Sequence, residues 1–331
     1  MMKNQSQKAI INKMFEQIVD IIEKYDSIVI FGHKNPDGDC YGAAVALKRT
    51  LQLRYPEKKI YITGSGLRNF FDTLMPMDDV SDEVIKKSLA ILVDANDLWR
   101  MEDQRIHNCV AFTKIDHHVD TGTFNEGPAV VDDEANSTCD LITQLIVEQN
   151  WPIDSLIANA LYLGILTDSG RFQFVIDYPQ TFDRVSYLCH HGANPKALNR
   201  ILVMVSEDSL IAKAYVYSNY KKTENGVMYL IFRQKDLKKL GISTNHASNL
   251  INLIGNVEGY PVWASFAEYE DGKVRVEFRS NGPQVQPFAN AIGGGGHQYA
   301  SGCTLPSLDM NQINEIVDGL DKLVKDYKEG K

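Results

Sequence analysis

Five short and almost wholly apolar segments recur in the first part of the chain, with turn-forming or helix-like sequence between them. They are SIVIFG (27–32), KIYIT (59–63), LAILVD (89–94), VAFTKID (110–116) and PAVVDD (128–133). Strands that are apolar on both faces are typical of parallel sheets covered by helices on each side. A helical pattern over Ala43–Leu53 follows the first segment. The alternation predicts an α/β fold with a doubly wound, mainly parallel five-stranded sheet flanked by helices.

The pattern changes in the second part of the chain, where Val227–Phe232, Val262–Glu268 and Lys273–Phe278 are predicted strands. Asp271-Gly272 is a strong hairpin signal between the last two, and the chain closes with an amphipathic helix over Met310–Tyr327. These elements predict a smaller C-terminal α+β domain. We expect a first domain over 1–206, a connector over 207–220 and a second domain over 221–331.

Acidic and imidazole side chains follow several of the predicted strands where each strand should end. The segment FGHKNPDGD supplies His33, Asp37 and Asp39, VDAND supplies Asp94, KIDHH supplies Asp116, His117 and His118, and GILTDSGRF, at the end of a predicted helix, supplies Asp168. The carboxyl ends of parallel strands share one edge of the sheet, so these side chains should gather there. Taken alone, the first segment suits a helix-capping loop equally well. Four separate segments that deliver acids to one edge favour a metal site.

Oxygen ligands with a minority of imidazoles favour Mn²⁺ or Mg²⁺ over structural zinc, which usually takes thiolates. The carboxylates outnumber what one ion needs, so two ions sharing a bridging carboxylate is the simplest assignment. Two such ions about 3.5–4 Å apart hold a hydroxide and neutralise the oxygens of a phosphate under in-line attack. The residues therefore predict metal-assisted hydrolysis of a phosphoester.

The glycine-rich segment GGGGHQYASG (293–302) is a second candidate site. Consecutive glycines let backbone N–H groups wrap an anion, and His297 adds a donor. A glycine run alone is weak evidence for a site, and a flexible hairpin or a helix start is its more common explanation. Arg279 and Ser280 end the preceding predicted strand, where an arginine either binds phosphate or is a solvated charge. Chemistry alone assigns this region no role.

With these residues, the chain resembles the DHH phosphoesterase superfamily, in the branch with a DHH-associated C-terminal domain that includes nanoRNases and pAp phosphatases. HKNPDGD, VDAND, IDHH and GILTDSGRF resemble its four N-terminal motifs in order, and GGGGHQYASG resembles its GGGH signature. The resemblance implies one ion held by His33, Asp37 and Asp94, and a second held by Asp39, Asp94, His117 and Asp168. Asp94 would bridge the ions, His118 would face the scissile phosphate and Asp116 would orient the histidine pair.

The same resemblance implies that Arg279, Ser280, Gly295, Gly296 and His297 bind the terminal nucleotide or phosphate, with the active site in the cleft between the domains. The implied enzyme uses two Mn²⁺ ions, or Mg²⁺ instead, to activate a bridging hydroxide. It degrades short oligoribonucleotides to mononucleotides and dephosphorylates pAp. Linear or cyclic dinucleotide messengers are the alternative substrates. A nucleotide or RNA sensor without turnover is less favoured, because no metal ligand is missing.

Charge and composition limit the partners and the compartment. A net charge of −9 argues against a broad basic surface for long nucleic acid and leaves short oligonucleotides or mononucleotide bisphosphates as substrates. No apolar stretch approaches the ~18 residues of a membrane span, and the N-terminal segment has helical periodicity instead of a signal-peptide core. The five cysteines are scattered singly, as suits a reducing compartment. We expect a cytoplasmic protein without a membrane partner, and a homodimer is compatible with the sequence.

Overall fold

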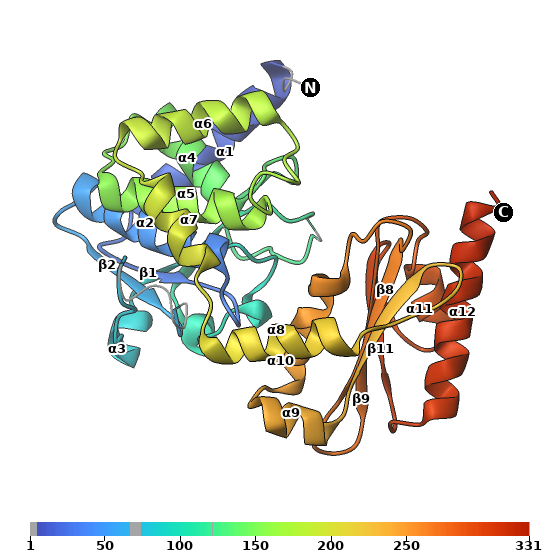
Figure 1. Cartoon of the computed structure of the whole chain (residues 1–331). Helices are drawn as coiled ribbons and strands as arrows, with labels where there is room; N and C mark the ends of the chain where they lie inside the picture. Colours follow the sequence, from blue (N-terminus) through green and yellow to red (C-terminus); the bar gives the residue numbers. More distant parts are fainter. Residues whose placement is uncertain (1–4, 67–73, 121, 331) are drawn as a thin grey trace. The chain divides into compact units, whose positions relative to one another are not determined.

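A computed structural model describes residues 5–66, 74–120 and 122–330, and it divides the chain into two compact units, Met1–Val203 and Met204–Lys331 (Figure 1). The first unit contains a five-stranded sheet of order β2-β1-β3-β4-β5 in which every neighbouring pair is parallel. The strands are β1 (Ser27–Phe31), β2 (Lys59–Thr63), β3 (Leu89–Val93), β4 (Ala111–Asp116) and β5 (Ala129–Val131). The predicted parallel sheet is confirmed.

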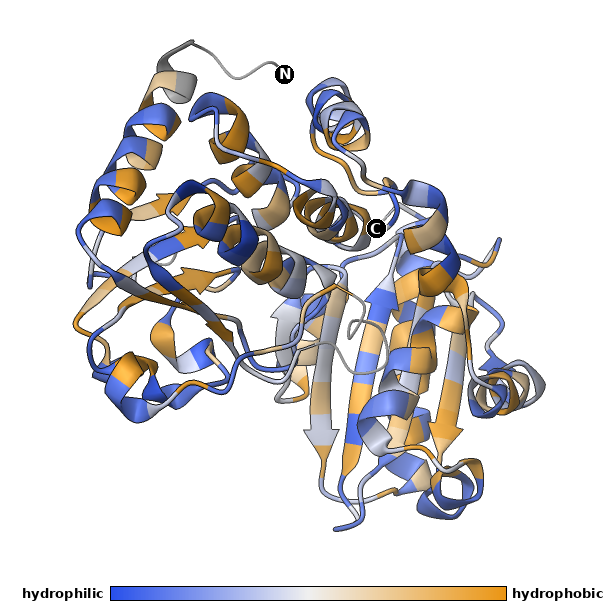
Figure 2. Cartoon of the chain, turned by 90° about the vertical axis from the view of Figure 1, so that its left-hand side faces the viewer, coloured by the Kyte–Doolittle hydropathy of each residue, from blue (hydrophilic) through white to orange (hydrophobic). Residues whose placement is uncertain are grey.

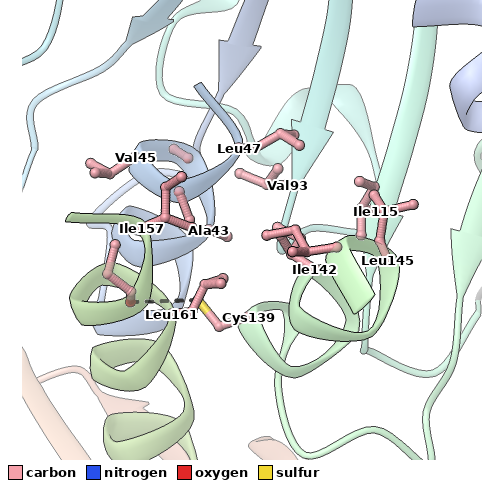
Figure 3. Close-up of a cluster of buried hydrophobic side chains, with 14 of the residues drawn as sticks. Ala43, Val45, Leu47, Val93, Ile115, Cys139, Ile142, Leu145, Ile157 and Leu161 are labelled. Carbon is pink, nitrogen blue, oxygen red and sulfur yellow. Dashed lines mark hydrogen bonds between the residues drawn. The ribbon is translucent and has the colours of Figure 1, made fainter. Parts of the chain in front are cut away.

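Helices cover both faces of this sheet, which is why its strands are apolar on both sides. Ile28 and Ile30 of β1 face a large core against one helical layer, whereas Val29 and Phe31 face a smaller core on the other side. Figure 3 shows part of the large core, where side chains of three helices pack over Val93 and Ile115. The helices of the first unit are α1 (Gln5–Glu23), α2 (Gly38–Arg54), α3 (Asp82–Ile85), the 3₁₀ helices η1 (Leu98–Arg100) and η2 (Gln104–Asn108), α4 (Thr138–Glu148), α5 (Ser155–Asp168), α6 (Tyr178–His190) and α7 (Pro195–Val203).

Helix α2 begins earlier than the sequence predicts. The prediction began at Ala43, where the apolar periodicity starts, but the helix begins at Gly38. Asp37 is the cap, because its Oδ1 accepts the backbone N–H groups of Asp39 and Cys40, each over 3.0 Å. The second half of FGHKNPDGD is therefore already helical, and Asp39 lies in the first turn.

The N-terminal segment forms the predicted amphipathic helix. Ile11, Phe15, Ile18 and Ile22 are buried on one side of α1, at helical spacing. Across the described ranges, no helix combines the length and the apolar character that crossing a membrane requires.

The second unit contains a mixed six-stranded sheet of order β10-β11-β9-β8-β7-β6, in which β7 and β8 are parallel and the other neighbouring pairs are antiparallel. One face packs against α11 and α12 and the other against α8, α10 and η3. Figure 2 shows apolar residues along the strands of both units and on the helices that pack against them. The strands are β6 (Lys221–Lys222), β7 (Val227–Phe232), β8 (Val262–Glu268), β9 (Val274–Ser280), β10 (Gly295–His297) and β11 (Ala300–Leu305).

The helices of the second unit are α8 (Glu207–Asn219), α9 (Gln234–Leu240), α10 (Thr244–Asn249), η3 (Leu250–Ile254), α11 (Gln286–Ala291) and α12 (Met310–Lys328). The smaller α+β domain and the β8–β9 hairpin with its turn at Gly272 are confirmed. Helix α8, which coincides with the expected connector, packs into the core of the second unit through Ala212 and Val216. The predicted domain limits themselves stay a prediction.

Candidate metal centre

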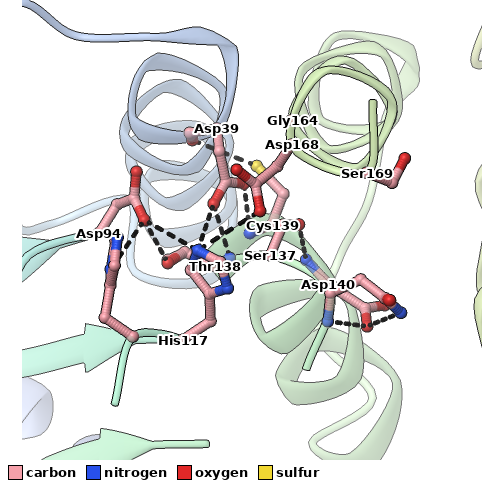
Figure 4. A network of polar contacts seen from close by, with 12 residues as sticks. Asp39, Asp94, His117, Ser137, Thr138, Cys139, Asp140, Gly164, Asp168 and Ser169 are labelled. Carbon is pink, nitrogen blue, oxygen red and sulfur yellow. Dashed lines mark hydrogen bonds and ion pairs between the residues drawn. The ribbon is translucent and has the colours of Figure 1, made fainter. Parts of the chain in front are cut away.

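Most of the predicted ligands meet at the carboxyl edge of the first sheet (Figure 4). His33 Nε2 lies 3.3 Å from Asp94 Oδ2. His117 Nε2 lies 3.5 Å from Asp94 Oδ1, 3.4 Å from Asp168 Oδ2 and 3.9 Å from Asp39 Oδ2. These side chains come from the β1–α2 turn, the first turn of α2, the ends of β3 and β4, and the last residue of α5. Asp94 is the carboxylate that both histidines approach.

Asp37 differs from the other predicted ligands. Its Oδ1 caps α2, and Asp37 is absent from the groups whose ligand atoms converge within 4.8 Å among the described residues. Cys40 takes its place there, because its thiol converges with His33 and Asp94. Asp37 therefore fulfils the capping role that the sequence left open, and its part as a metal ligand stays a prediction.

The backbone of Asp94 is strained. Its φ is 60°, a left-handed conformation that is uncommon for residues other than glycine. The surrounding structure holds it there, since its N–H donates to the carbonyl of Ile115 on β4 over 3.1 Å and its Oδ1 accepts from Thr138 Oγ1 over 3.0 Å. Strain of this kind persists where neighbouring contacts determine the conformation, often at functional sites.

The N-terminus of α4 holds Asp39. The carboxylate accepts the backbone N–H of Thr138 over 2.7 Å and that of Cys139 over 2.9 Å. A helix N-terminus carries partial positive charge and unsatisfied N–H groups, so it favours an anion there. Gly164 of α5 allows this packing, because a Cβ at that position would lie 2.2 Å from Cys139 Sγ and 2.6 Å from Asp39 Oδ1.

The cluster concentrates negative charge around two buried carboxylates, Asp39 and Asp94, with Asp168 at its solvent-exposed side. Burial, followed by the charges of Asp94 and Asp168, holds the pKa of Asp39 well above its usual range. Burial likewise raises the pKa of Asp168 to about 6, although His117 acts in the opposite direction. Burial disfavours a charged His33, but hydrogen bonds, first to Asp94, outweigh it and raise its pKa to about 11.

The donor set fits divalent cations. Among the residues that the structure describes, no lysine or arginine forms an ion pair with Asp39, Asp94 or Asp168, and the partners are imidazoles alone. Buried carboxylates need a compensating positive charge. Ions bound by the carboxylates and imidazoles would supply that charge.

His118 points to a different partner from His117. Its Nδ1 lies 2.7 Å from Asp116 Oδ1, and this hydrogen bond raises the pKa of His118 above its usual value. Asp116 is fully buried, and its Oδ2 lies 3.9 Å from Lys114 Nζ. When the side-chain amide of Asn96 is turned so that its NH₂ group faces Asp116, this group donates to Oδ2 over 3.0 Å. Asp116 therefore lies in hydrogen-bonding contact with His118, and its part in orienting the histidine pair stays a prediction.

The glycine-rich segment forms a β-hairpin, the structural alternative that the sequence left open. Gly296 of β10 pairs with Ser301 of β11. Its φ of 133° suits glycine, and a Cβ at this position would lie 2.6 Å from the carbonyl oxygen of Ala300. Across the sheet, His297 pairs with Ala300 and Ala300 pairs with Arg279. Of the substrate-binding residues predicted in this unit, Arg279 and Ser280 lie on β9, and Gly295, Gly296 and His297 lie on β10, with β11 between the two strands.

Two family models match these two units. The DHH family N-terminal domain matches residues 27–165, and the DHHA1 domain matches residues 224–326. The probable bifunctional oligoribonuclease and PAP phosphatase NrnA of Streptococcus mutans is 33% identical over 94% of this chain and 99% of its own length. The chain belongs to the DHH family. The DHH relative from Bacillus subtilis, bifunctional oligoribonuclease and PAP phosphatase NrnA, is 30% identical over 95% of this chain and 100% of its own length.

Solved structures support the same fold. An exopolyphosphatase-related protein from Bacteroides fragilis superposes with a TM-score of 0.82 at 21% identity, covering 96% of this chain and 97% of its own. At this identity the likeness concerns the fold alone, and it extends over both the DHH and the DHHA1 parts of the chain.

Sequence reasoning missed several residues of this DHH site. Thr138 and Cys139 begin α4, and nothing in their local sequence indicates that this helix points at Asp39. Lys114 could have been found from the sequence, because a lysine within an otherwise apolar strand needs a polar partner in the protein interior. Cys40 could also have been found, since its thiol comes directly after the predicted ligands Asp37 and Asp39 in the chain.

Proposed function

We propose that the chain is a metal-dependent phosphoesterase that hydrolyses short oligoribonucleotides to mononucleotides and removes a phosphate from pAp, adenosine 3′,5′-bisphosphate. The observation that carries the proposal is the buried carboxylate of Asp94, approached by His33 on one oxygen and by His117 on the other. The two NrnA relatives, which align over nearly their whole lengths, support the same substrates.

We assign the ions as Mn²⁺, with Mg²⁺ as the alternative, because oxygen donors predominate. His33, Asp37 and Asp94 would hold one ion, and Asp39, Asp94, His117 and Asp168 the other. When bound, the ions lower the pKa of a coordinated water and offset the negative charge of the phosphate. The N–H groups of Thr138 and Cys139 fix the lone pairs of Asp39, so the site is preorganised before an ion arrives.

His118 would act on the substrate directly. Because Asp116 engages Nδ1, Nε2 is the nitrogen left to face the scissile phosphate. The raised pKa of His118 favours the protonated ring, which donates a hydrogen bond to a phosphate oxygen and stabilises the charge that builds up during attack. Asp116 keeps the ring in this orientation.

We further propose that Arg279, Ser280, Gly295, Gly296 and His297 bind the terminal nucleotide or phosphate. Arg279 on β9 and His297 on β10 pair with the same residue, Ala300, of the intervening strand β11, and this supports the proposal. Arg279 is currently paired with Glu277, its Nη1 lying 2.9 Å from Oε2, so phosphate binding would compete with that ion pair.

A time course with purified protein tests the function. A labelled five-residue oligoribonucleotide and pAp are incubated with Mn²⁺ and Mg²⁺ in parallel, together with linear and cyclic dinucleotides. We expect mononucleotides from the RNA, and AMP with inorganic phosphate from pAp. Hydrolysis of dinucleotide messengers alone would establish the alternative substrate class. Tight pAp binding without any product would indicate a sensor, and the enzymatic proposal would be abandoned.

We also propose a cytoplasmic location. All five cysteines are free in the structure, which suits a reducing compartment. The homodimer stays a prediction, and its measurement is the molar mass in solution by light scattering.

A further inference from the structure

Trp99 is a strongly exposed aromatic residue on a segment that is hydrogen-bonded to the β1–α2 turn. It lies in η1, shortly after Asp94 at the carboxyl end of β3, and 71% of its surface is exposed. Tryptophan is highly buried in most proteins, and the other two tryptophans here, Trp151 and Trp263, are buried. An exposed indole offers a large apolar surface with one N–H donor, as is typical of residues that bind a ligand or a partner.

The segment that carries Trp99 is tightly held. Asp97 Oδ1 accepts the N–H of Trp99 over 2.9 Å and that of Arg100 over 3.1 Å. Gln104 Nε2 donates to the Met101 carbonyl over 2.6 Å. Lys34 Nζ donates to the Trp99 carbonyl over 3.1 Å. These bonds fix the backbone, so the ring is presented at a defined place.

This segment is joined directly to the loop that carries a predicted metal ligand. The N–H of Lys34 donates to the Arg100 carbonyl over 2.8 Å, and His33 forms a backbone bridge with Met101. The backbone of Trp99 therefore lies next to the turn that carries His33, and the cations Lys34 and Arg100 belong to the same two joined segments.

The indole packs beside the tilted ring of a neighbouring histidine. The ring of His107 lies 4.6 Å from it, centroid to centroid, at an interplanar angle of 48°. The ring is nevertheless mostly exposed, so room is left for a second flat group. An aromatic ring flanked by cations next to a phosphoester site is the arrangement with which proteins hold unpaired nucleotides, through base stacking and phosphate attraction.

We propose that Trp99 is a nucleobase-stacking residue, on which a base of the substrate lies while its phosphate is at the metal centre. Lys34 and Arg100 attract the phosphates that flank this base. The inference rests on the proposed function and extends it, because it assigns the base subsite to the first unit. Stacking recognises any base, so it would provide affinity for nucleotides without sequence preference.

The kinetic test compares pAp with its abasic analogue, ribose 3,5-bisphosphate, which lacks the adenine. Stacking is worth about 5- to 150-fold in affinity per base. We expect Trp99→Leu to raise the KM for pAp by about that factor, to change kcat little, and to leave the abasic analogue unaffected. Trp99→Phe should retain most of the affinity. The matched control is Tyr327→Leu, which removes an exposed aromatic ring from α12.

Equal losses on pAp and on the abasic analogue would mean that Trp99 supports the loop, and the proposal would be wrong. An unchanged KM for pAp would overturn it as well. A fluorescence titration tests base binding independently of turnover, using the Mg²⁺-loaded protein and AMP, with ribose 5-phosphate as the base-free control. We expect AMP to quench the emission of Trp99 and ribose 5-phosphate to leave it unchanged. In Trp99→Phe, AMP should no longer change the emission. Without quenching in the wild type, the inference fails even if the enzyme hydrolyses pAp; quenching without hydrolysis would instead remove the proposed function.

Discussion

The backbone N–H of Cys139 donates to Asp39 Oδ1 over 2.9 Å, although 100 residues separate the two in the chain. The carboxylate therefore meets the N-terminus of α4, where the helix dipole favours negative charge. This contact keeps Asp39 in place inside a cluster of like charges that would otherwise repel it.

Removing the shared carboxylate should abolish activity. Asp94→Asn keeps the size of the side chain but removes its charge, and the ions would lose the ligand assigned to both. Metal ions contribute several kcal/mol to transition-state stabilisation, so we expect hydrolysis of pAp to fall by about 10³-fold. Calorimetric titration with Mn²⁺ should show weaker binding, and circular dichroism should show an unchanged fold. Turnover near the wild-type rate would contradict the two-ion assignment.

Thr138 should act through Asp94. Its Oγ1 donates to Asp94 Oδ1 over 3.0 Å, and both residues are buried. Groups that orient a metal ligand typically contribute about 10–100-fold in affinity, so Thr138→Val should weaken Mn²⁺ binding by that factor. Thr138→Ser keeps the hydroxyl and should restore most of it. Equal binding by the two variants would show that the hydroxyl does not position Asp94.

Gly164 should tolerate no side chain. The added Cβ of Gly164→Ala would meet Cys139 Sγ and Asp39 Oδ1, so α5 must move away from α4. Overpacking of this kind costs about 1–3 kcal/mol of the free energy of unfolding, measurable by urea denaturation. Cys139→Ala in the same chain removes the nearer contact and should recover part of the loss. If the two substitutions are simply additive, the clash is not the cause.

The metal-free protein should become less stable as pH rises through the range where Asp168 titrates. Burial raises the pKa of Asp168 from 3.8 to about 6, so the folded state keeps a proton that the unfolded state releases. The free energy of unfolding therefore falls between about pH 4 and pH 6. At pH 7, Asp168→Asn should be more stable than the wild type in EDTA by about 1 kcal/mol, less than the full pKa shift would give, because Asp168 is partly exposed to water. Below pH 4 this advantage should vanish.

Saturating Mn²⁺ should reverse that order at pH 7, because ion binding stabilises the wild type and the variant has lost a ligand. Urea denaturation of the wild type and the variant at pH 7 and below pH 4, with and without Mn²⁺, measures the free energy of unfolding under all four conditions. A variant that is never more stable than the wild type would show that the carboxylate is not under electrostatic strain.

Cys40 should influence which ion binds. Its thiol converges with His33 and Asp94 within 4.8 Å, and sulfur prefers Zn²⁺ or Co²⁺ to Mn²⁺. Cys40→Ser should therefore weaken Co²⁺ binding more than Mn²⁺ binding, and the absorption of a cobalt–thiolate bond should disappear. Cys109→Ser, a buried cysteine in the core on the other face of the sheet, is the matched control. Equal losses for both ions would rule out sulfur coordination.

The sequence predicted the sheet well because buried parallel strands are recognisable as apolar runs. All five strands lie within their predicted segments. The start of α2 was missed because the capping side chain of Asp37, and not apolar periodicity, sets it. The residue types and their positions after the strands predicted that the ligands gather at one edge of the sheet. The assignment of each ligand to one of two ions came from the family resemblance. The contact between Asp39 and α4, and the convergence of Cys40, depend on how distant helices pack, so local sequence could not reveal them.

The residues of the metal centre are spread along the chain from His33 to Asp168, on strands and helices that support one another. During synthesis, the centre cannot form until α5 has left the ribosome and packed against α2 and α4. A fragment that ends before α5 would carry most of the acidic residues without the helix that closes the cluster. Metal binding can therefore serve as a readout of complete folding of the first unit, and an early arrest in synthesis would leave a chain that does not retain the ions.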